Sequence, residues 1–305
     1  MIAVVGATAS GKTSLAIKIA QKYGGEIVSA DSMQIYKGMD TATAKPTKEE
    51  MCGIPHHIMD FLSPTETFSV SQYVDMARET IDDILSRGKV PIVCGGTGLY
   101  IRSLVENVQF SPENADEKLR DELNERYAKE GGEVLLRELS EFDPETAKTL
   151  HPSNNKRIIR AIEIYKTTGV TMSEHIRKSK DIPSPYEWTV IGISFEDRQK
   201  LYDRINMRVD IMLEQGLLDE TREFFRENKG KTAVGAIGYK ELKPYLDGEM
   251  SLEEAVENLK QVTRNYAKRQ ITWFRKDDYI NWIYADRCED VFEEAEKILS
   301  PRFTK

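Results

Sequence analysis

Short apolar runs alternate with segments of helical periodicity at the start of the chain. Ile2–Val5 is an unbroken apolar run, which predicts a short buried strand. A glycine-bearing loop follows. Ser14–Tyr23 then carries apolar side chains at helical spacing, until Gly24 and Gly25 stop the predicted helix.

The same alternation continues further along the chain. Glu26–Ala30 predicts a second strand, which ends at Asp31. Phe68–Arg87 predicts a long helix, and Val90–Cys94 predicts a third strand. Strands that alternate with helices in this way are typical of a parallel sheet, so we expect an α/β fold.

The pattern changes at the polar stretch Gln109–Asp116, and from there to Lys180 the sequence carries only helical signals. Asp181–Tyr186 contains two prolines and predicts a link, and Thr189–Phe195 predicts a strand that returns to the sheet. We therefore expect an all-helical domain inserted into a discontinuous α/β core. The predicted core is 1–111 and 185–305, and the predicted insertion is 112–184.

Composition narrows the class of protein. The chain has 305 residues, of which 40% are hydrophobic and 31% are charged, a balance typical of globular proteins. Its three cysteines form no Cys-x-x-Cys pair, which disfavours a disulfide framework or a structural zinc and fits a reducing cytosol. No apolar run is long enough for a membrane span, and no secretory signal precedes the first strand, so we expect a cytoplasmic protein.

The loop between the first strand and the first helix carries a phosphate-binding motif. Gly6–Thr13 matches G-x-x-x-x-G-K-[ST], whose glycines let successive backbone N–H groups face one anion at a helix start. Lys12 adds a positive charge, and the Thr13 hydroxyl is expected to hold Mg²⁺. The motif indicates a bound diphosphate or triphosphate. The predicted phosphate-binding residues are Gly6, Ala7, Thr8, Ala9, Ser10, Gly11, Lys12, Thr13 and Ser14.

Further motifs accompany this loop. Asp31–Tyr36, with the sequence DSMQIY, follows the second strand, and Gly95–Tyr100, with the sequence GGTGLY, follows the third. Together with Gly6–Thr13, they resemble the bacterial tRNA dimethylallyltransferases, the tRNA isopentenyltransferase family. Ala42 departs from the family, which usually has glycine there. Further matches are Met39–Pro46, Pro55–His57, His151-Pro152 with Arg157 and Arg160, Ala236–Glu241 and Ala267–Arg275.

The resemblance implies a P-loop fold and a specific reaction. A dimethylallyl group would pass from dimethylallyl diphosphate to the N6 amine of the adenine 3′-adjacent to the anticodon in tRNA, with Mg²⁺ as cofactor. The implied partners are the tRNA anticodon stem-loop and the diphosphate, for a monomeric protein with no membrane partner. Charge on the leaving diphosphate develops early in allylic substitution. Lys12, the loop amides and Mg²⁺ on Thr13 would stabilise this charge.

Asp31 ends a strand beside the phosphate-binding loop, where doubly wound sheets bind their ligands. The resemblance implies that Asp31 is the base toward the amine. The alternatives are an aspartate that caps the next helix or one that holds Mg²⁺ through water, and the last role is compatible with a base.

The resemblance also implies that Thr97 contacts the target nucleotide. Glycines on both sides of Thr97 would let a substrate approach the backbone closely. By spacing alone, Thr97 would be an ordinary turn residue. Ser32 and Gln34 offer a hydroxyl and an amide to a base edge or a phosphate. His56 and His57 lack metal-ligand partners at suitable spacing, so we interpret them as structural.

Arg204 and Arg208 share a face of the helix predicted after the returning strand. P-loop kinases place arginines similarly against the transferred phosphate, so we expect this pair to clamp the diphosphate. A solvated face paired with Asp203 and Asp210 is the alternative. The predicted catalytic residues are therefore Asp31, Thr97, Lys12 and Arg204.

The net charge of −8 argues mildly against a nucleic-acid partner, but affinity for phosphate depends on local patches. Two basic stripes lie on predicted helices, and each is either a track for an RNA backbone or a solvated face. The resemblance favours RNA, whose target base must be unstacked before it can react. The predicted tRNA-binding residues are Asp31, Ser32, Met33, Gln34, Thr97, Lys156, Arg157, Arg160, Arg264, Lys268 and Arg269.

The residues leave two other functions open. A small-molecule P-loop kinase would use the same loop for ATP and Asp31 as base toward a hydroxyl. A nucleotide-gated RNA-binding protein would use the basic stripes without catalysis, although Asp31 beside Lys12 and Thr13 disfavours it.

Overall fold

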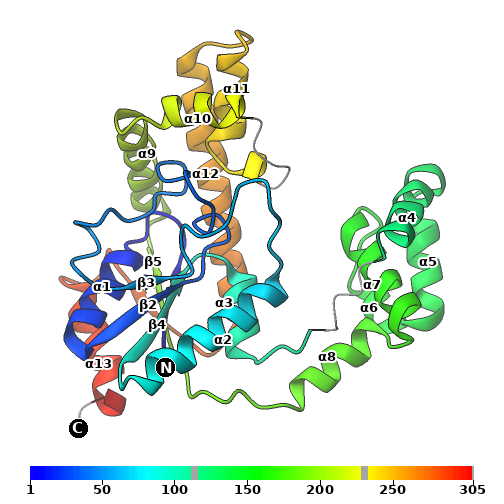
Figure 1. Cartoon of the computed structure of the whole chain (residues 1–305), viewed down its shortest axis with the longest axis horizontal. Coiled ribbons are helices and arrows are strands. Elements are labelled where there is room, and N and C mark those ends of the chain that lie inside the picture. The colour runs from blue at the N-terminus through cyan, green and yellow to red at the C-terminus, as the bar shows by residue number, and fades with distance from the viewer. Residues whose placement is uncertain (111–115, 228–232, 304–305) are drawn as a thin grey trace. The chain divides into compact units, whose positions relative to one another are not determined.

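The computed structural model describes residues 1–110, 116–227 and 233–303 (Figure 1). Contacts divide the chain into two compact units. The first comprises Met1–Arg102 and Tyr186–Lys305, and the second is Ser103–Pro185. The predicted insertion 112–184 falls within the second unit, and the predicted boundary at residues 111 and 112 lies outside the described residues.

The first unit is built on a six-stranded sheet in which all the strand pairs are parallel. Its order is β3-β2-β4-β1-β5-β6. The strand after the helical segment returns to the sheet, as predicted, and there it pairs with β1. This arrangement confirms the expected α/β fold. The strands are β1 (Ile2–Gly6), β2 (Gly25–Ser29), β3 (His56–His57), β4 (Val90–Gly95), β5 (Thr189–Ser194) and β6 (Ile280–Tyr284).

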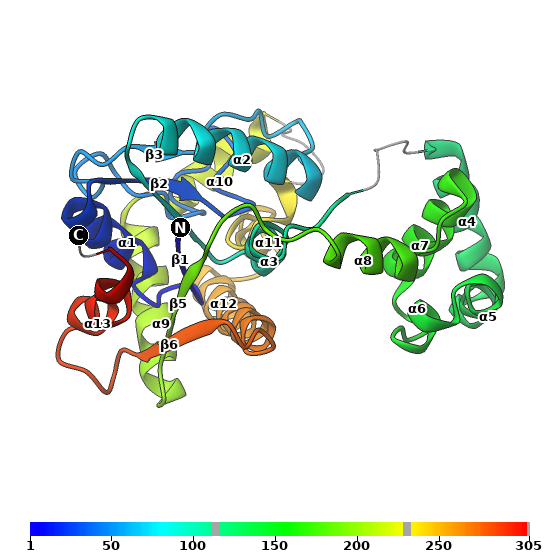
Figure 2. The same ribbon diagram turned by 90° about the horizontal axis from the view of Figure 1, so that it is seen from below.

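Helices cover both faces of this sheet (Figure 2). α1 (Lys12–Tyr23) and α13 (Val291–Phe303) lie on one side, and α2 (Val70–Ser86) and α12 (Leu252–Phe274) lie on the other. Since both faces are covered, the central strands are buried on both sides and are apolar throughout their length. The other helices of the unit are α9 (Arg198–Glu214), α10 (Leu217–Arg226) and α11 (Tyr239–Leu246), with a 3₁₀ turn at Ala233–Gly235 and the start of α3 (Gly98–Val105).

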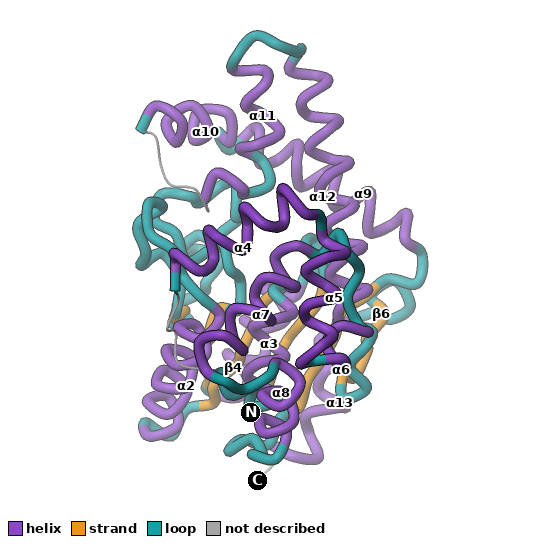
Figure 3. The backbone as a smooth tube through the Cα atoms, turned by 90° about the vertical axis from the view of Figure 1, so that its right-hand side faces the viewer, coloured by secondary structure: helices purple, strands orange, loops and turns teal. Residues whose placement is uncertain are grey.

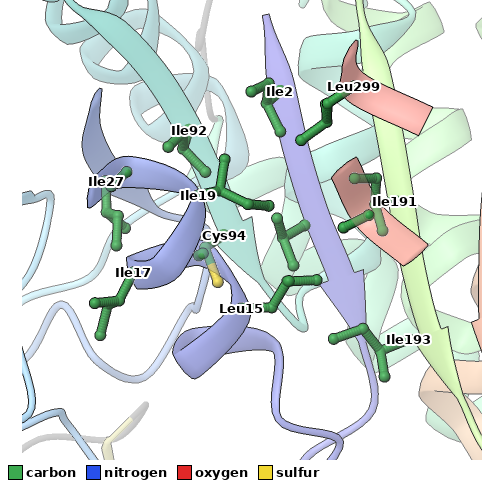
Figure 4. Close-up of a cluster of buried hydrophobic side chains, with 14 of the residues drawn as sticks. Ile2, Leu15, Ile17, Ile19, Ile27, Ile92, Cys94, Ile191, Ile193 and Leu299 are labelled. Atoms are coloured by element: carbon green, nitrogen blue, oxygen red, sulfur yellow. The ribbon is translucent and has the colours of Figure 1, made fainter. Parts of the chain in front are cut away.

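The core between α1, α13 and the sheet is a continuous apolar cluster (Figure 4). Leu15 and Ile19 of α1 and Leu299 of α13 pack with Ile2 and Ile191 of the strands, and all five are almost completely buried. Burial of each such side chain contributes about 1.5–3 kcal/mol. This packing holds the N-terminus of α1, which carries the phosphate-binding motif, against the end of β1.

The second unit consists of helices alone in its described residues (Figure 3), as the periodicity predicted. Its own apolar cluster includes Leu123, Leu135, Leu139, Ile158 and Ile162. Among the helices of the described residues, none is both long and apolar enough to cross a membrane. The helices are α4 (Glu117–Glu130), α5 (Gly132–Phe142), α6 (Pro144–Lys148), α7 (Asn155–Thr168) and α8 (Met172–Lys180), preceded by the end of α3.

Candidate functional site

A cavity of about 350 Å³ lies where three neighbouring strands of the first unit end. Lys12 and Thr13 follow β1, Asp31 follows β2, and Cys94 lies at the end of β4. Parallel sheets bind ligands at this edge, because the chain crosses to opposite faces after adjacent strands and leaves a crevice. The structure therefore brings together at one cavity the motifs that are separate in the sequence.

The phosphate-binding loop takes its shape from a left-handed turn at Gly11, where φ is 93°. α1 begins immediately afterwards, at Lys12, so the unpaired N–H groups of its first turn face the loop. The Lys12 ammonium donates a hydrogen bond to the Ala7 carbonyl at 3.3 Å and lines the cavity. Burial lowers the pKa of Lys12, while the nearby Asp31 carboxylate opposes this shift. An anionic ligand would stabilise the charged form further.

Both arginines on the predicted face of α9 approach the loop or the cavity. Arg204 Nε donates to the Ala9 carbonyl at 2.9 Å, and its guanidinium lies 5.7 Å from the centroid of the Phe195 ring. Arg208 lines the cavity. Burial lowers the pKa of Arg208, and Asp31 acts in the opposite direction. The carboxylates considered as their partners interact elsewhere, Asp203 with Gln199 and Asp210 with Lys260.

A hydrogen-bonded cluster lies at the ends of β2 and β4, where Asp31 lines the cavity and Thr97 supports it from behind without being a lining residue. Asp31 Oδ1 accepts from the Met33 N–H at 2.9 Å, which fixes the orientation of the carboxylate. Thr97 Oγ1 accepts from the Ser32 N–H at 3.0 Å, and the Thr97 N–H donates to the Ala30 carbonyl at 3.1 Å. These two hydrogen bonds connect the turn that carries Thr97 to the segment that carries Asp31.

Comparison with known proteins decides the family. The sequence model of a family described as IPP transferase matches residues 34–277, and one described as isopentenyl transferase matches residues 1–65. The chain belongs to the IPP transferase family. It is 50% identical over 301 residues to the tRNA dimethylallyltransferase of Acetivibrio thermocellus. The aligned region covers 98% of this chain and 95% of the relative. The resemblance inferred from the motifs is confirmed.

Solved structures of the IPP transferase family share the fold. A tRNA isopentenylpyrophosphate transferase from Staphylococcus epidermidis is 43% identical, with a TM-score of 0.72 over 99% of this chain and 98% of that chain. A eukaryotic dimethylallyltransferase acting on tRNA is 31% identical, with a TM-score of 0.85 over 99% of this chain and 79% of that chain. These likenesses confirm the predicted P-loop-like α/β class.

Cys94, Tyr266 and Gln270 are among the cavity residues of this IPP transferase that were not predicted as site residues from the sequence. Burial raises the pKa of the Cys94 thiol to about 11, so Cys94 is a neutral thiol at neutral pH. The pKa of Tyr266 is raised, chiefly by burial and further by Asp31. Gln270 lies one helical turn further along α12 than Tyr266. Cys94 ends a predicted strand, which was a usable signal. Tyr266 and Gln270 reach the cavity only because α12 packs there.

The predicted RNA-binding residues are distributed over both units. Arg269 lines the cavity, and with Lys268 it also lines a second hollow of about 520 Å³ along α12. Arg264 is largely buried and pairs with Glu257 at 2.9 Å. In the second unit, Lys156, Arg157 and Arg160 lie on α7. Lys156 and Arg157 are exposed, and Arg160 pairs with Glu163 at 3.1 Å.

The cavity suits a Mg²⁺ ion that is held mainly by a bound diphosphate. The described part of the chain contains no group of three or more His, Cys, Asp or Glu side chains placed to bind a metal. Mg²⁺ in phosphate sites characteristically takes only one or two protein oxygens, with the rest from phosphate and water. The Thr13 hydroxyl and the Asp31 carboxylate both line the cavity and fit that requirement.

Proposed function

We propose that this protein transfers a dimethylallyl group from dimethylallyl diphosphate to the N6 amine of the adenine 3′-adjacent to the anticodon in tRNA, with release of diphosphate. The observation that carries the proposal is the single cavity in which Lys12 and Thr13 lie together with Asp31. One end suits a leaving diphosphate and the other an amine. The curated relatives and solved structures named above are transferases of this kind.

On the donor side, the reaction breaks the bond between the allylic carbon and the diphosphate oxygen. Lys12, Arg208 and the loop amides supply positive charge where negative charge grows on the departing oxygen. Arg204 acts through the backbone, because its bond to the Ala9 carbonyl holds the loop in shape. Mg²⁺ held by Thr13 and the diphosphate would supply further charge stabilisation.

On the acceptor side, the adenine N6 forms the new bond to the allylic carbon. This amine is a poor nucleophile, because its lone pair is delocalised into the ring. Asp31 accepts a hydrogen bond from the amine, orients its lone pair and then takes its proton, which becomes acidic as the carbon–nitrogen bond forms. Thr97 accepts a hydrogen bond from the Ser32 N–H, and in this place it positions the adenine ring beside Asp31.

The RNA must place one unstacked base in the cavity, and cations on both units suit its phosphate backbone. Lys268, Arg269 and Lys276 line the hollow along α12, and Lys156 and Arg157 are exposed on the second unit. We propose a monomer as the active form. Since tRNA is the acceptor, we place the reaction in the cytoplasm.

The test offers the protein two donors and two acceptors. Purified protein is incubated with Mg²⁺, an unmodified anticodon stem-loop and either labelled dimethylallyl diphosphate or γ-labelled ATP. A second stem-loop carries purine without the exocyclic amine at the target position. The proposal expects label from dimethylallyl diphosphate in the first RNA only. Label from ATP in a small-molecule acceptor would support the kinase instead, and binding of RNA without transfer from either donor would support the non-catalytic module.

A further inference from the structure

One buried side chain contacts both the phosphate-binding loop and the turn that carries Thr97, which are the two halves of the proposed site. Gln270 of α12 is only 6% exposed. Its Oε1 accepts a hydrogen bond from the Thr8 N–H of the phosphate-binding loop at 2.9 Å. Its Nε2 donates to the carbonyl of Gly96, in the turn that carries Thr97, at 3.0 Å. Because one partner is a donor and the other an acceptor, the two bonds also determine which way round the amide lies.

The turn is built to receive this amide. A Cβ at Gly96 would come within 2.3 Å of Gln270 Nε2, so only glycine leaves room for the hydrogen bond. One helical turn later, Trp273 packs against Gly98, where a Cβ would meet the indole at 2.1 Å. α12 therefore contacts the turn at both glycines, through side chains on the same helix face.

The two halves that Gln270 joins have different tasks. Thr8 belongs to the loop that binds the diphosphate, whereas Gly96 precedes Thr97, which is bonded to the segment of Asp31. The donor carbon is thus positioned by one half and the adenine amine by the other. Bond formation requires these two atoms at about 3–3.5 Å with aligned orbitals, and a misplacement of about 1 Å can cost roughly 10²-fold in rate.

We infer that Gln270 is a positioning residue for the transfer reaction, whose amide sets the spacing between the phosphate-binding loop and the turn that carries Thr97. This inference rests on the proposed function, because it concerns the approach of donor to acceptor. When Gln270 is changed, the diphosphate still contacts the phosphate-binding loop and the adenine still contacts the segment of Asp31 and Thr97. The loss therefore falls on the chemical step, while binding of either substrate alone is largely preserved.

Two substitutions separate the hydrogen bonds from the packing. Gln270→Met keeps the length and most of the volume of the side chain but removes both bonds. Gln270→Glu keeps the acceptor for the Thr8 N–H and loses the donor to Gly96. It also provides a polar variant if the methionine protein fails to fold. Gln199→Met is the matched control, because Gln199 is exposed on α9 and bonds to Asp203 of its own helix. Ile84→Ala, a core truncation near the C-terminal end of α2, controls for general loss of stability.

The experiment measures the single-turnover rate at saturating dimethylallyl diphosphate and anticodon stem-loop, together with the separate affinity for each. Both Gln270 variants are expected to lose roughly 10²-fold in rate, with affinities within about threefold of wild type. Both controls should keep the wild-type rate below their melting temperatures. Wild-type rates at saturation in both Gln270 variants would overturn the inference, as would a loss confined to the affinities. A wild-type protein that leaves RNA unlabelled would instead overturn the proposed function.

Discussion

At the scale of single residues, the hydrogen bond from the Met33 N–H to Asp31 Oδ1 provides a clean test of the base. Asn in place of Asp can keep this bond with its amide oxygen, so Asp31→Asn should preserve the local structure while removing the proton acceptor. We expect the single-turnover rate to fall by roughly 10²–10⁴-fold, the usual worth of a positioned general base. Affinities for dimethylallyl diphosphate and RNA should change little.

Other roles for Asp31 predict other patterns. If Asp31 mainly held Mg²⁺, Asp31→Asn would weaken donor binding and recover part of its rate at high Mg²⁺. If it only oriented the amine, Asp31→Asn would keep substantial rate and Asp31→Ala would not. Measuring both variants across Mg²⁺ concentrations distinguishes these cases, and near-normal turnover in Asp31→Ala would remove Asp31 from the chemical step.

Some cavity residues could be predicted from the sequence because a local motif places them, and others could not because long-range packing places them. Lys12 and Thr13 belong to a loop whose chemistry is local to a few residues, and Asp31 follows an apolar run that marks a strand end. Tyr266 and Gln270 carry no such signal. They face the cavity because α12 packs across the sheet edge, which depends on contacts between residues far apart in the chain.

At the scale of elements, α10 is tied to the loop after β2 by one carboxylate. Glu220 of α10 accepts hydrogen bonds from the consecutive N–H groups of Asp40, Thr41 and Ala42 at 3.0, 2.7 and 3.0 Å. It also accepts from the Tyr239 hydroxyl of α11 at 2.7 Å. Ala42 and its two following neighbours line the cavity, so this carboxylate holds part of the cavity wall in place.

Removal of the Glu220 carboxylate should therefore loosen that wall. Bonds to a charged acceptor contribute about 1.5–3 kcal/mol each, so in Glu220→Ala the amides of residues 40–42 should exchange hydrogen roughly tenfold faster or more. Glu223→Ala is the matched control, since the Glu223 carboxylate is exposed on the same helix and pairs with exposed Arg226. Unchanged exchange at residues 40–42 in Glu220→Ala would contradict the assignment.

A second carboxylate, at the start of β2, has a consequence for acid stability. Glu26 of β2 is buried and bonds to Arg87, at the end of α2, and to His57 of β3. The Arg87 guanidinium is the main cause that lowers the pKa of Glu26 from 4.5 to about 2. Because the folded pKa lies below the unfolded one, the ionised pair stabilises the fold above about pH 4.5. This stabilisation is lost as the pH falls toward about 2.

Unfolding by urea at several pH values tests this effect. The free energy of unfolding of wild type minus that of Glu26→Gln should be positive and constant at neutral pH, and should shrink progressively below pH 4.5. Taking the difference cancels the acid titration of groups that do not interact with Glu26. A difference that stays constant down to pH 3 would show that the native pair does not depress the pKa of Glu26.

The sequence predicted most elements of the core but not its two edge strands. β1, β4 and β5 are central and buried on both faces, so their apolar runs stand out. β6 mixes buried and exposed residues without a regular alternation, and β3 is only His56–His57. Such edge strands are defined mainly by the neighbour with which they pair, so local pattern identifies them poorly.

At the scale of the whole molecule, a net charge of −8 coexists with basic residues on both units. Some of these basic residues form an ion pair with a carboxylate, and others are exposed to solvent. On α7 of the second unit, Arg160 Nη1 lies 3.1 Å from Glu163 Oε2, and Arg120 Nη2 lies 2.8 Å from Glu163 Oε1. Glu163 itself is buried, whereas Arg157 on the same helix is exposed. Replacement of Arg157 should therefore weaken RNA binding more than replacement of Arg160.

Arg157→Gln should weaken binding of the anticodon stem-loop and make the slope of log affinity against log salt shallower by roughly 0.7–0.9, the value of one lost phosphate contact. Arg160→Gln should change the slope less, because its charge is already paired, and should lower the stability of the second unit by leaving buried Glu163 with Arg120 alone. Lys129→Gln, an exposed change on α4, is the control for general charge loss. Donor affinity should be unchanged in all three. If Arg157→Gln and Lys129→Gln give the same salt slope as wild type, Arg157 belongs to a solvated face and the RNA backbone passes elsewhere.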